Sequence, residues 1–132
     1  MKKVFILAAA CCLAATAALF TSCENEQKSS YQYIVALDDS IEQDPSMCMQ
    51  FELNALPIIM QEMKKTADQS GDNSVIFKDT KNNADKRAKD AFAAGIAKLR
   101  EGGIGSYKDL VVVLKAMDND TNKFNVIDKV TL

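Results

Sequence analysis

The sequence predicts a small α+β domain in which two helices pack on one face of a four-stranded, mostly antiparallel sheet. Two segments, residues 44–70 and 84–101, carry apolar side chains at helical spacing. Short segments that alternate in polarity or are rich in β-branched residues lie before, between and after them, and two of these are consecutive at the C-terminal end. The expected order of elements is therefore β-α-β-α-β-β.

The first strand is predicted at residues 31–37. Large apolar side chains occupy every second position there, which is the period of a strand with one buried face. These side chains are Tyr31, Tyr33, Val35 and Leu37. The strand should end at Asp38-Asp39-Ser40, because these residue types favour turns.

The longest helix should begin at Asp44 and Pro45 and end near Ser70-Gly71. The Asp44 carboxylate can accept hydrogen bonds from the free amides of the first turn, and proline is preorganised for the first helical position. Pro57 lies inside the segment, where it lacks an amide donor and crowds the carbonyl of Leu53. A kink or a break is therefore expected at Pro57.

Apolar residues at alternating intervals of four and three form a stripe along this helix. The stripe consists of Met49, Leu53, Leu56, Met60, Met63 and Ala67, and it is bordered by Cys48, Phe51, Ala55 and Ile59. We expect the stripe to be core, because such spacing is typical of a buried helix face. The alternatives for its methionines are a partner groove or a copper site. Cys48, on the apolar side, is expected to be a buried, inert thiol.

A second strand and a second helix follow. The β-branched segment Ser74–Phe77 predicts the strand, and polar residues 79–83 should connect it to a helix over residues 84–101. Its expected buried face consists of Ala88, Phe92, Ile96 and Leu99. The small residues Ala91, Ala94 and Gly95 should let it lie close to a sheet. Gly102 should end the helix in the left-handed conformation.

The C-terminal segment predicts a hairpin. Residues 110–114 are too short and too β-branched for a helix, and they are expected to be the most buried, central strand. Residues 118–123 form a polar turn, and residues 124–132 form the final strand. The last two strands should pair in antiparallel fashion.

The N-terminal residues have the pattern of a secretory signal. Lys2 and Lys3 precede an apolar stretch, Val4 to Phe20, and the stretch ends in Thr21-Ser22-Cys23. This ending resembles the lipobox of bacterial lipoprotein precursors, with Phe20 where the family usually has leucine. The resemblance implies that the Cys23 thiol receives a diacylglyceryl group, that residues 1–22 are removed, and that the freed amine is acylated, for example with palmitate.

Other processing routes follow from the same residues. Cys11 and Cys12 come after three alanines and are alternative lipid acceptors, although cleavage there would leave a short apolar segment. A non-lipidated signal peptide and an uncleaved anchor are further alternatives. The predicted organisation is a signal peptide at residues 1–22, a lipidated cysteine with a flexible tether at residues 23–30, and one domain at residues 31–132.

The resemblance also implies a location. A lipidated Cys23 would anchor the chain in the outer membrane of a Gram-negative bacterium. Glu24 and Glu26 resemble the acidic residues that direct some lipoproteins to the cell surface, but a merely solvated tether facing the periplasm explains them equally well.

Composition argues against several classes of function. Two of the 16 lysines and arginines lie in the leader, which leaves 14 against 18 acidic side chains, so no basic surface for nucleic acid is expected. The absence of histidine excludes Ser-His and Cys-His couples and imidazole metal ligands. Once Cys23 is acylated and the leader is gone, Cys48 has no intramolecular disulfide partner. No cofactor is expected.

One segment is similar to a calcium-binding loop. Asp118, Asp120 and Asn122 occupy the first, third and fifth ligand positions of such a loop. Lys123 stands where the loop needs glycine, and Lys129 stands where it needs a bidentate glutamate. The segment is therefore predicted to be a hairpin turn and not a metal site.

These observations favour a membrane-anchored, non-catalytic module that binds an envelope protein or a glycan, or that supports an envelope assembly. The alternative is a small carboxylate-based or accessory enzyme that acts on envelope or extracellular glycans. Its candidate carboxylates would be Asp38 with Asp39, or Asp118 with Asp120.

Overall fold

The computed structural model describes residues 27–103 and 105–132, and residues 30–78 and 82–132 form one compact unit. Five strands make one sheet: β2 (Ser29–Leu37), β3 (Gln69–Ser70), β4 (Val75–Asp79), β5 (Val111–Asp118) and β6 (Lys123–Thr131). The helical elements are α1 (Pro45–Gln50), the π-helical segment η3 (Phe51–Ala55), α2 (Leu56–Lys64), α3 (Lys81–Glu101) and a 3-10 turn, η4 (Gly105–Tyr107). No helix among the described residues is both long and apolar enough to span a membrane.

The predicted α+β class is confirmed, but the sheet has five strands and not four. Its spatial order is β3-β4-β2-β5-β6, so β2 lies in the middle and β5 lies between β2 and β6. The pairs β2–β5, β5–β6 and β3–β4 are all antiparallel. The order along the chain becomes β-α-β-β-α-β-β.

The additional strand, β3, comes from residues that were expected to be helical. The helix ends at Lys64, and Gln69 and Ser70 pair instead with Ile76 and Val75 of β4. The turn closes through the Gly71 amide, which donates to the Ser74 carbonyl over 2.9 Å. The polar Gln-Ser segment forms a strand because it pairs with backbone amide and carbonyl groups of β4 that would otherwise lie unpaired at the edge of the sheet. This pairing cannot be predicted from the local sequence.

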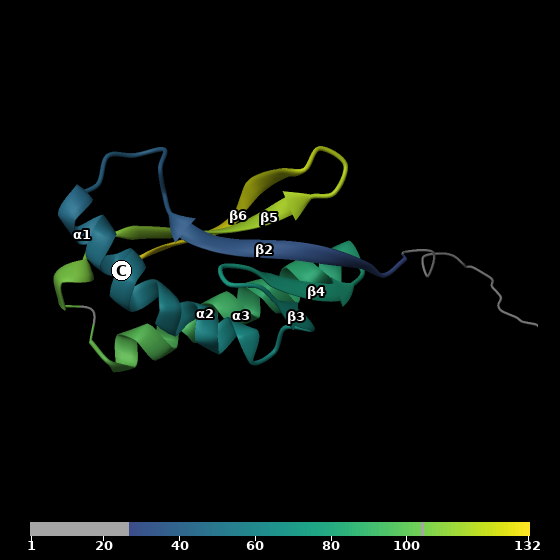
Figure 1. The fold of residues 1–132 in the computed structure, drawn as a ribbon, viewed down its shortest axis with the longest axis horizontal. Coiled ribbons are helices and arrows are strands. Elements are labelled where there is room, and N and C mark those ends of the chain that lie inside the picture. Colours follow the sequence, from purple (N-terminus) through teal and green to yellow (C-terminus); the bar gives the residue numbers. More distant parts are fainter. Residues whose placement is uncertain (1–26, 104) are drawn as a thin grey trace, which may run out of the picture. The chain divides into compact units, whose positions relative to one another are not determined.

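The core lies between the sheet and the helices. In Figure 1, α2 and α3 lie on the same side of β2 and β5. Alternate residues of β2, Tyr33 and Val35, are buried on that side, as the strand pattern predicted. The Tyr33 ring packs edge-on against Phe77 of β4, with 5.8 Å between the ring centroids. The β5 side chains on this face are Val112, Leu114 and Ala116, all buried.

The predicted stripe of the first helix is confirmed only at Met60 and Met63, and before Pro57 the helix buries a different face. Met49 is 63% exposed and Leu53 is 69% exposed, and Leu56 is only half-buried. The buried positions are Phe51, Ala55, Ile59, Met60 and Met63. Four of these positions lie four residues apart: Phe51, Ala55, Ile59 and Met63. In a regular α-helix of 3.6 residues per turn, side chains at this spacing turn gradually away from a single face. A wide π-helical turn reduces this drift and keeps them toward the core.

Pro57 and the π-helical segment are neighbours. The Leu56 amide donates to the carbonyl of Phe51, five residues earlier, and the helix then continues through Pro57. The irregularity predicted at Pro57 is therefore a wide turn just before it, and the helix is not broken. The predicted start of the first helix is confirmed. Asp44 precedes Pro45, the first residue of α1, and its carboxylate accepts hydrogen bonds from the Ser46 and Met47 amides.

Helix α3 begins three residues earlier than expected, and its buried face is the predicted one. Gly95 makes the close approach that its size suggested, but to α2: a Cβ built there would lie 2.8 Å from Ile59 Cγ2. The left-handed glycine after the helix is Gly103, with φ of 89°, and not Gly102.

The predicted C-terminal hairpin is present. Its turn is closed by the Asn122 amide, which donates to the Asp118 carbonyl over 2.7 Å, and Asn122 adopts the left-handed conformation with φ of 58°. Leu114 pairs with Asp128 and Lys115 pairs with Val126, which leaves Ile127 without an opposite residue. This is a β-bulge, and it bends the edge strand β6.

Candidate functional site

A cleft opens beside the loop that connects β2 to α1. Its volume is about 530 Å³. Its polar lining consists of Asp38, Asp39, Glu42, Gln43, Glu52 and Lys115, and Ile41 and Cys48 supply apolar surface. Cys48 is half-buried and not the fully buried thiol that was expected. The cleft is thus made by the end of β2, the following loop, α1 and η3, and one side chain of β5.

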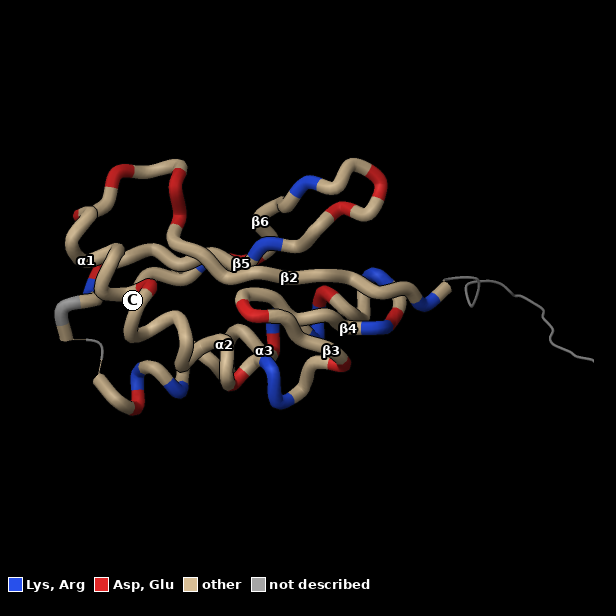
Figure 2. The backbone as a smooth tube through the Cα atoms, viewed as in Figure 1, with Lys and Arg blue, Asp and Glu red and all other residues tan. Residues whose placement is uncertain are grey.

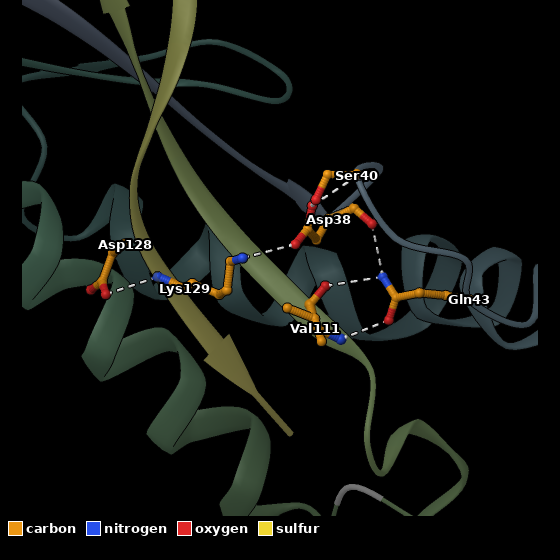
Figure 3. Close-up of polar contacts among 6 residues, drawn as sticks. All are labelled: Asp38, Ser40, Gln43, Val111, Asp128 and Lys129. Carbon is orange, nitrogen blue, oxygen red and sulfur yellow. Dashed lines mark hydrogen bonds and ion pairs between the residues drawn. The ribbon is translucent and has the colours of Figure 1, made fainter.

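Asp38 is the most enclosed polar residue of this cleft, at 5% exposure. Its Oδ1 accepts hydrogen bonds from the Ser40 amide at 2.9 Å and from the Ser40 hydroxyl at 2.6 Å. Its Oδ2 lies 3.1 Å from Lys129 Nζ, at ion-pair distance but with poor angles for a hydrogen bond. Figure 3 shows the Lys129 side chain reaching from β6 across β5 to Asp38.

These contacts strengthen the preference of Asp38 for its ionised form. The Ser40 hydroxyl, then the Ser40 amide and the Lys129 ammonium, lower the pKa of this carboxyl to about 2. Asp38 is therefore an anion across the physiological pH range. A carboxylate in this state cannot serve as a general acid near neutral pH, because such an acid needs a raised pKa.

Gln43 holds the loop to the sheet. Its Oε1 accepts from the Val111 amide at 2.8 Å, and its Nε2 donates to the Val111 carbonyl at 3.3 Å and to the Asp38 carbonyl at 3.1 Å. The side-chain amide thus pairs with both main-chain groups of Val111, as a residue of a neighbouring strand would (Figure 3). Sequence reasoning missed this residue, because one glutamine among polar loop residues carries no pattern.

The structure does not bring the two candidate carboxylate pairs together. Asp38 adjoins Val111, at the start of β5, and Asp118 is the last residue of β5. Seven residues of strand separate these positions by about 23 Å, so the two alternative pairs lie at different places on the sheet. The Asp118 carboxylate accepts from the Asp120 amide at 2.8 Å and so stabilises the hairpin turn. Within the described ranges, no three His, Cys, Asp or Glu side chains converge as metal ligands.

Two other polar clusters serve the fold. The Tyr33 hydroxyl donates to Asp85 of α3 at 2.7 Å, and burial, together with this bond, raises the pKa of Tyr33 far above its usual range. Asp68 accepts from the Lys78 amide at 2.6 Å and lies 3.2 Å from Arg87, and these contacts lower its pKa. Arg87 also stacks over the Phe77 ring at 4.8 Å. Both clusters tie α3 to the strands.

Comparison with known proteins gives no match, whether to a family model, a curated protein or a solved structure. The site must therefore be judged from its own geometry. In the cleft, the enclosed polar groups of Asp38 and Gln43 are occupied in fixing the loop, whereas Asp39, Glu42 and Glu52 are exposed.

The predicted lipidation site lies outside the described residues. The signal peptide, the alternative acceptors Cys11 and Cys12, Cys23 and the acidic residues that follow it all fall within residues 1–26. The tether was expected to extend to Ser30, but β2 already begins at Ser29.

Proposed function

We propose that this chain is an outer-membrane lipoprotein of a Gram-negative bacterium, anchored through Cys23. Its folded domain is a non-catalytic module that binds an envelope protein or a glycan at the periplasmic or outer surface. The single observation that carries the proposal is the sequence at the N-terminal end: two lysines, an apolar stretch, and a cysteine directly after Thr21-Ser22.

The cleft supports the non-catalytic part of the proposal. Asp38 is held in its ionised form by Ser40 and Lys129, and Gln43 is paired with the backbone of Val111. General acid catalysis at neutral pH would need a carboxyl with a raised pKa, whereas the pKa of Asp38 is lowered. The contacts of Asp38 and Gln43 are those of a fixed loop that presents its outer side chains to a partner.

Metabolic labelling with a palmitate analogue tests the anchor. The label should be lost in Cys23→Ala and kept in the double variant Cys11→Ala/Cys12→Ala. The reverse result would assign the lipid to the earlier cysteines, and a label kept in every variant would refute lipidation at any of them. Protease treatment of intact cells then distinguishes a surface-facing domain, which is degraded, from a periplasmic one, which is protected.

A further inference from the structure

An exposed apolar strip runs along α1 and η3 next to the cleft. Met49 and Leu53 lie one turn apart and are 63% and 69% exposed, and Ile41, in the preceding loop, is 48% exposed. Glu52, the neighbour of Leu53, lines the same cleft as Ile41. Single exposed apolar residues are ordinary, but a pair one helix turn apart, with a third on the adjoining cleft, is the kind of apolar surface found at interaction sites.

The charged residues of the segment that carries this strip all have one sign, and the described lining of the adjacent cleft includes one cation, Lys115 of β5. Residues 38–61 contain five acids and no lysine or arginine. The acids are Asp38, Asp39, Glu42, Asp44 and Glu52. The rest of the chain carries 16 basic and 13 acidic side chains, so this segment holds the whole acidic excess of the protein. Figure 2 shows the acidic positions in the loop before α1.

Four of these five carboxylates have no cationic partner within the described residues. Asp38 is paired with Lys129, but no lysine or arginine of that part of the chain makes an ion pair with the exposed side chains of Asp39, Glu42, Asp44 or Glu52. Further along the helix the surface changes, because Ile58 lines a separate hollow with Lys65 and Lys98. We call Ile41, Met49 and Leu53, with the flanking Glu42 and Glu52, the acidic ridge.

The sign of the charge and the position of the ridge both disfavour a membrane as its occupant. Exposed carboxylates are repelled by anionic lipid headgroups, whereas helices that bind membranes carry lysine and arginine beside their apolar face. The chain enters the domain at the start of β2, and the ridge follows the end of β2. Eight residues of strand, 30–37, place the ridge about 26 Å from the point where the tether attaches.

We propose that the acidic ridge docks a cationic amphipathic segment of another protein, in which leucine-like side chains are flanked by lysine or arginine. The apolar side chains of the segment would cover Met49 and Leu53, and its cations would meet Glu42 and Glu52. This inference rests on the proposed binding function and names the chemistry of the partner. It is independent of which cysteine carries the lipid.

The test measures binding of a synthetic helix of about 15 residues, with leucines on one face and lysines beside them. The full-length lipidated protein is held in nanodiscs of zwitterionic lipid, and the signal from empty nanodiscs is subtracted. Leu53→Gln should weaken binding at least tenfold, roughly the effect of exposing one leucine at an interface. Glu52→Gln should weaken it roughly threefold and reduce its salt dependence.

Matched controls lie elsewhere on the surface. Val126→Thr removes exposed apolar surface from β6, and Asp72→Asn removes an exposed acid, and neither should change the affinity. A charge exchange provides the strongest support: Glu52→Lys should lose the lysine peptide and gain a peptide that carries glutamate in place of lysine.

Three results would overturn the inference. Equal binding by wild type and all variants would mean non-specific attraction. If the wild-type protein bound anionic vesicles through Leu53 and did not bind the peptide, the acidic ridge would be assigned to a membrane. Self-association of the protein that disappears in Leu53→Gln, with no peptide binding, would assign it to a second copy. A different result would reject only the proposed anchor. If the peptide binds, but the palmitate label is lost in Cys11→Ala/Cys12→Ala and kept in Cys23→Ala, the inference about the acidic ridge stands.

Discussion

Gly95 of α3 lies directly against Ile59 of α2. A Cβ at position 95 would be 2.8 Å from Ile59 Cγ2 and 2.9 Å from the Ile59 carbonyl oxygen, and the second of these atoms belongs to the backbone and cannot rotate away. The two helices therefore approach more closely than any residue larger than glycine would permit. This contact fixes α2, and the turn before it, against α3.

Gly95→Ala should destabilise the domain even though alanine favours helices. Alanine gains about 1 kcal/mol in helix propensity, but the overlap with the Ile59 backbone forces the helices apart, and we expect a net loss of roughly 1–3 kcal/mol. Urea unfolding of the leaderless protein, residues 24–132, measures the change. The exposed Ala97→Gly in the same helix should lose about 1 kcal/mol by propensity alone. A stabilised Gly95→Ala would contradict the close approach.

Two neighbouring substitutions test which face of the first helix is buried. Phe51 is fully buried, so Phe51→Ala should cost about 3–5 kcal/mol. Leu53 is 69% exposed, so Leu53→Ala should change stability by no more than about 0.5 kcal/mol. The same unfolding measurement compares them. If Leu53→Ala proved the costlier change, the π-helical turn would be misplaced and the face with Met49 and Leu53 would be core.

The stability of the domain should depend on pH through Asp38. Because the pKa of Asp38 is lowered from its ordinary value of 3.8 to about 2, the carboxylate stabilises the fold above about pH 4, and this contribution is lost as the pH falls toward 2. Asp38→Asn should flatten the dependence of stability on pH between these limits. Ser40→Ala removes the largest cause of the lowered pKa of Asp38. The pKa of Asp38 in the folded protein should then rise toward 3.8, and the pH range over which stability is lost should end at a higher pH. An unchanged slope in Asp38→Asn would contradict the assigned contacts.

Gln43→Ala should loosen the loop at the cleft. The substitution leaves the Val111 amide, which donates no other described hydrogen bond, without its acceptor, at a cost of about 1–3 kcal/mol. Hydrogen exchange should be faster at the Val111 amide and remain slow at Leu114, in the middle of β5. The adjacent Glu42→Ala is the control, because its exposed side chain makes no contact of this kind. Equal exchange in both variants would show that Gln43 does not hold the loop.

Local patterns predicted most of the elements but not which face of the first helix is buried before Pro57. The spacing of Met49, Leu53, Leu56 and Met60 fits a regular α-helix, and the four-residue spacing of Phe51, Ala55 and Ile59 fits one with a wide turn. Pro57 indicated an irregularity without telling its type. Contact with Gly95 of α3 selects the second pattern, and that contact is tertiary information.

The candidate site could be predicted only in part. Asp38 and Asp39 were recognisable as acids at the end of a strand, but their roles depend on partners far along the chain. Lys129 pairs with Asp38 from 91 positions away, and Gln43 pairs with Val111 from 68 positions away. Neither pairing has a periodicity or a motif. Both exist because the strand order places β5 and β6 beside the end of β2.

Both edges of the sheet resist extension by another copy. At one edge, β3 offers only two residues, and at the other the bulge at Ile127 interrupts the ladder of β6. If Cys23 anchors the chain in a membrane as proposed, each copy would meet its neighbours at a local concentration far above that in solution. Continuous edges would join such copies into shared sheets, whereas a short edge and a bent one leave them separate. With the proposed anchor, these two edges would allow copies to lie close together in the membrane plane without aggregating.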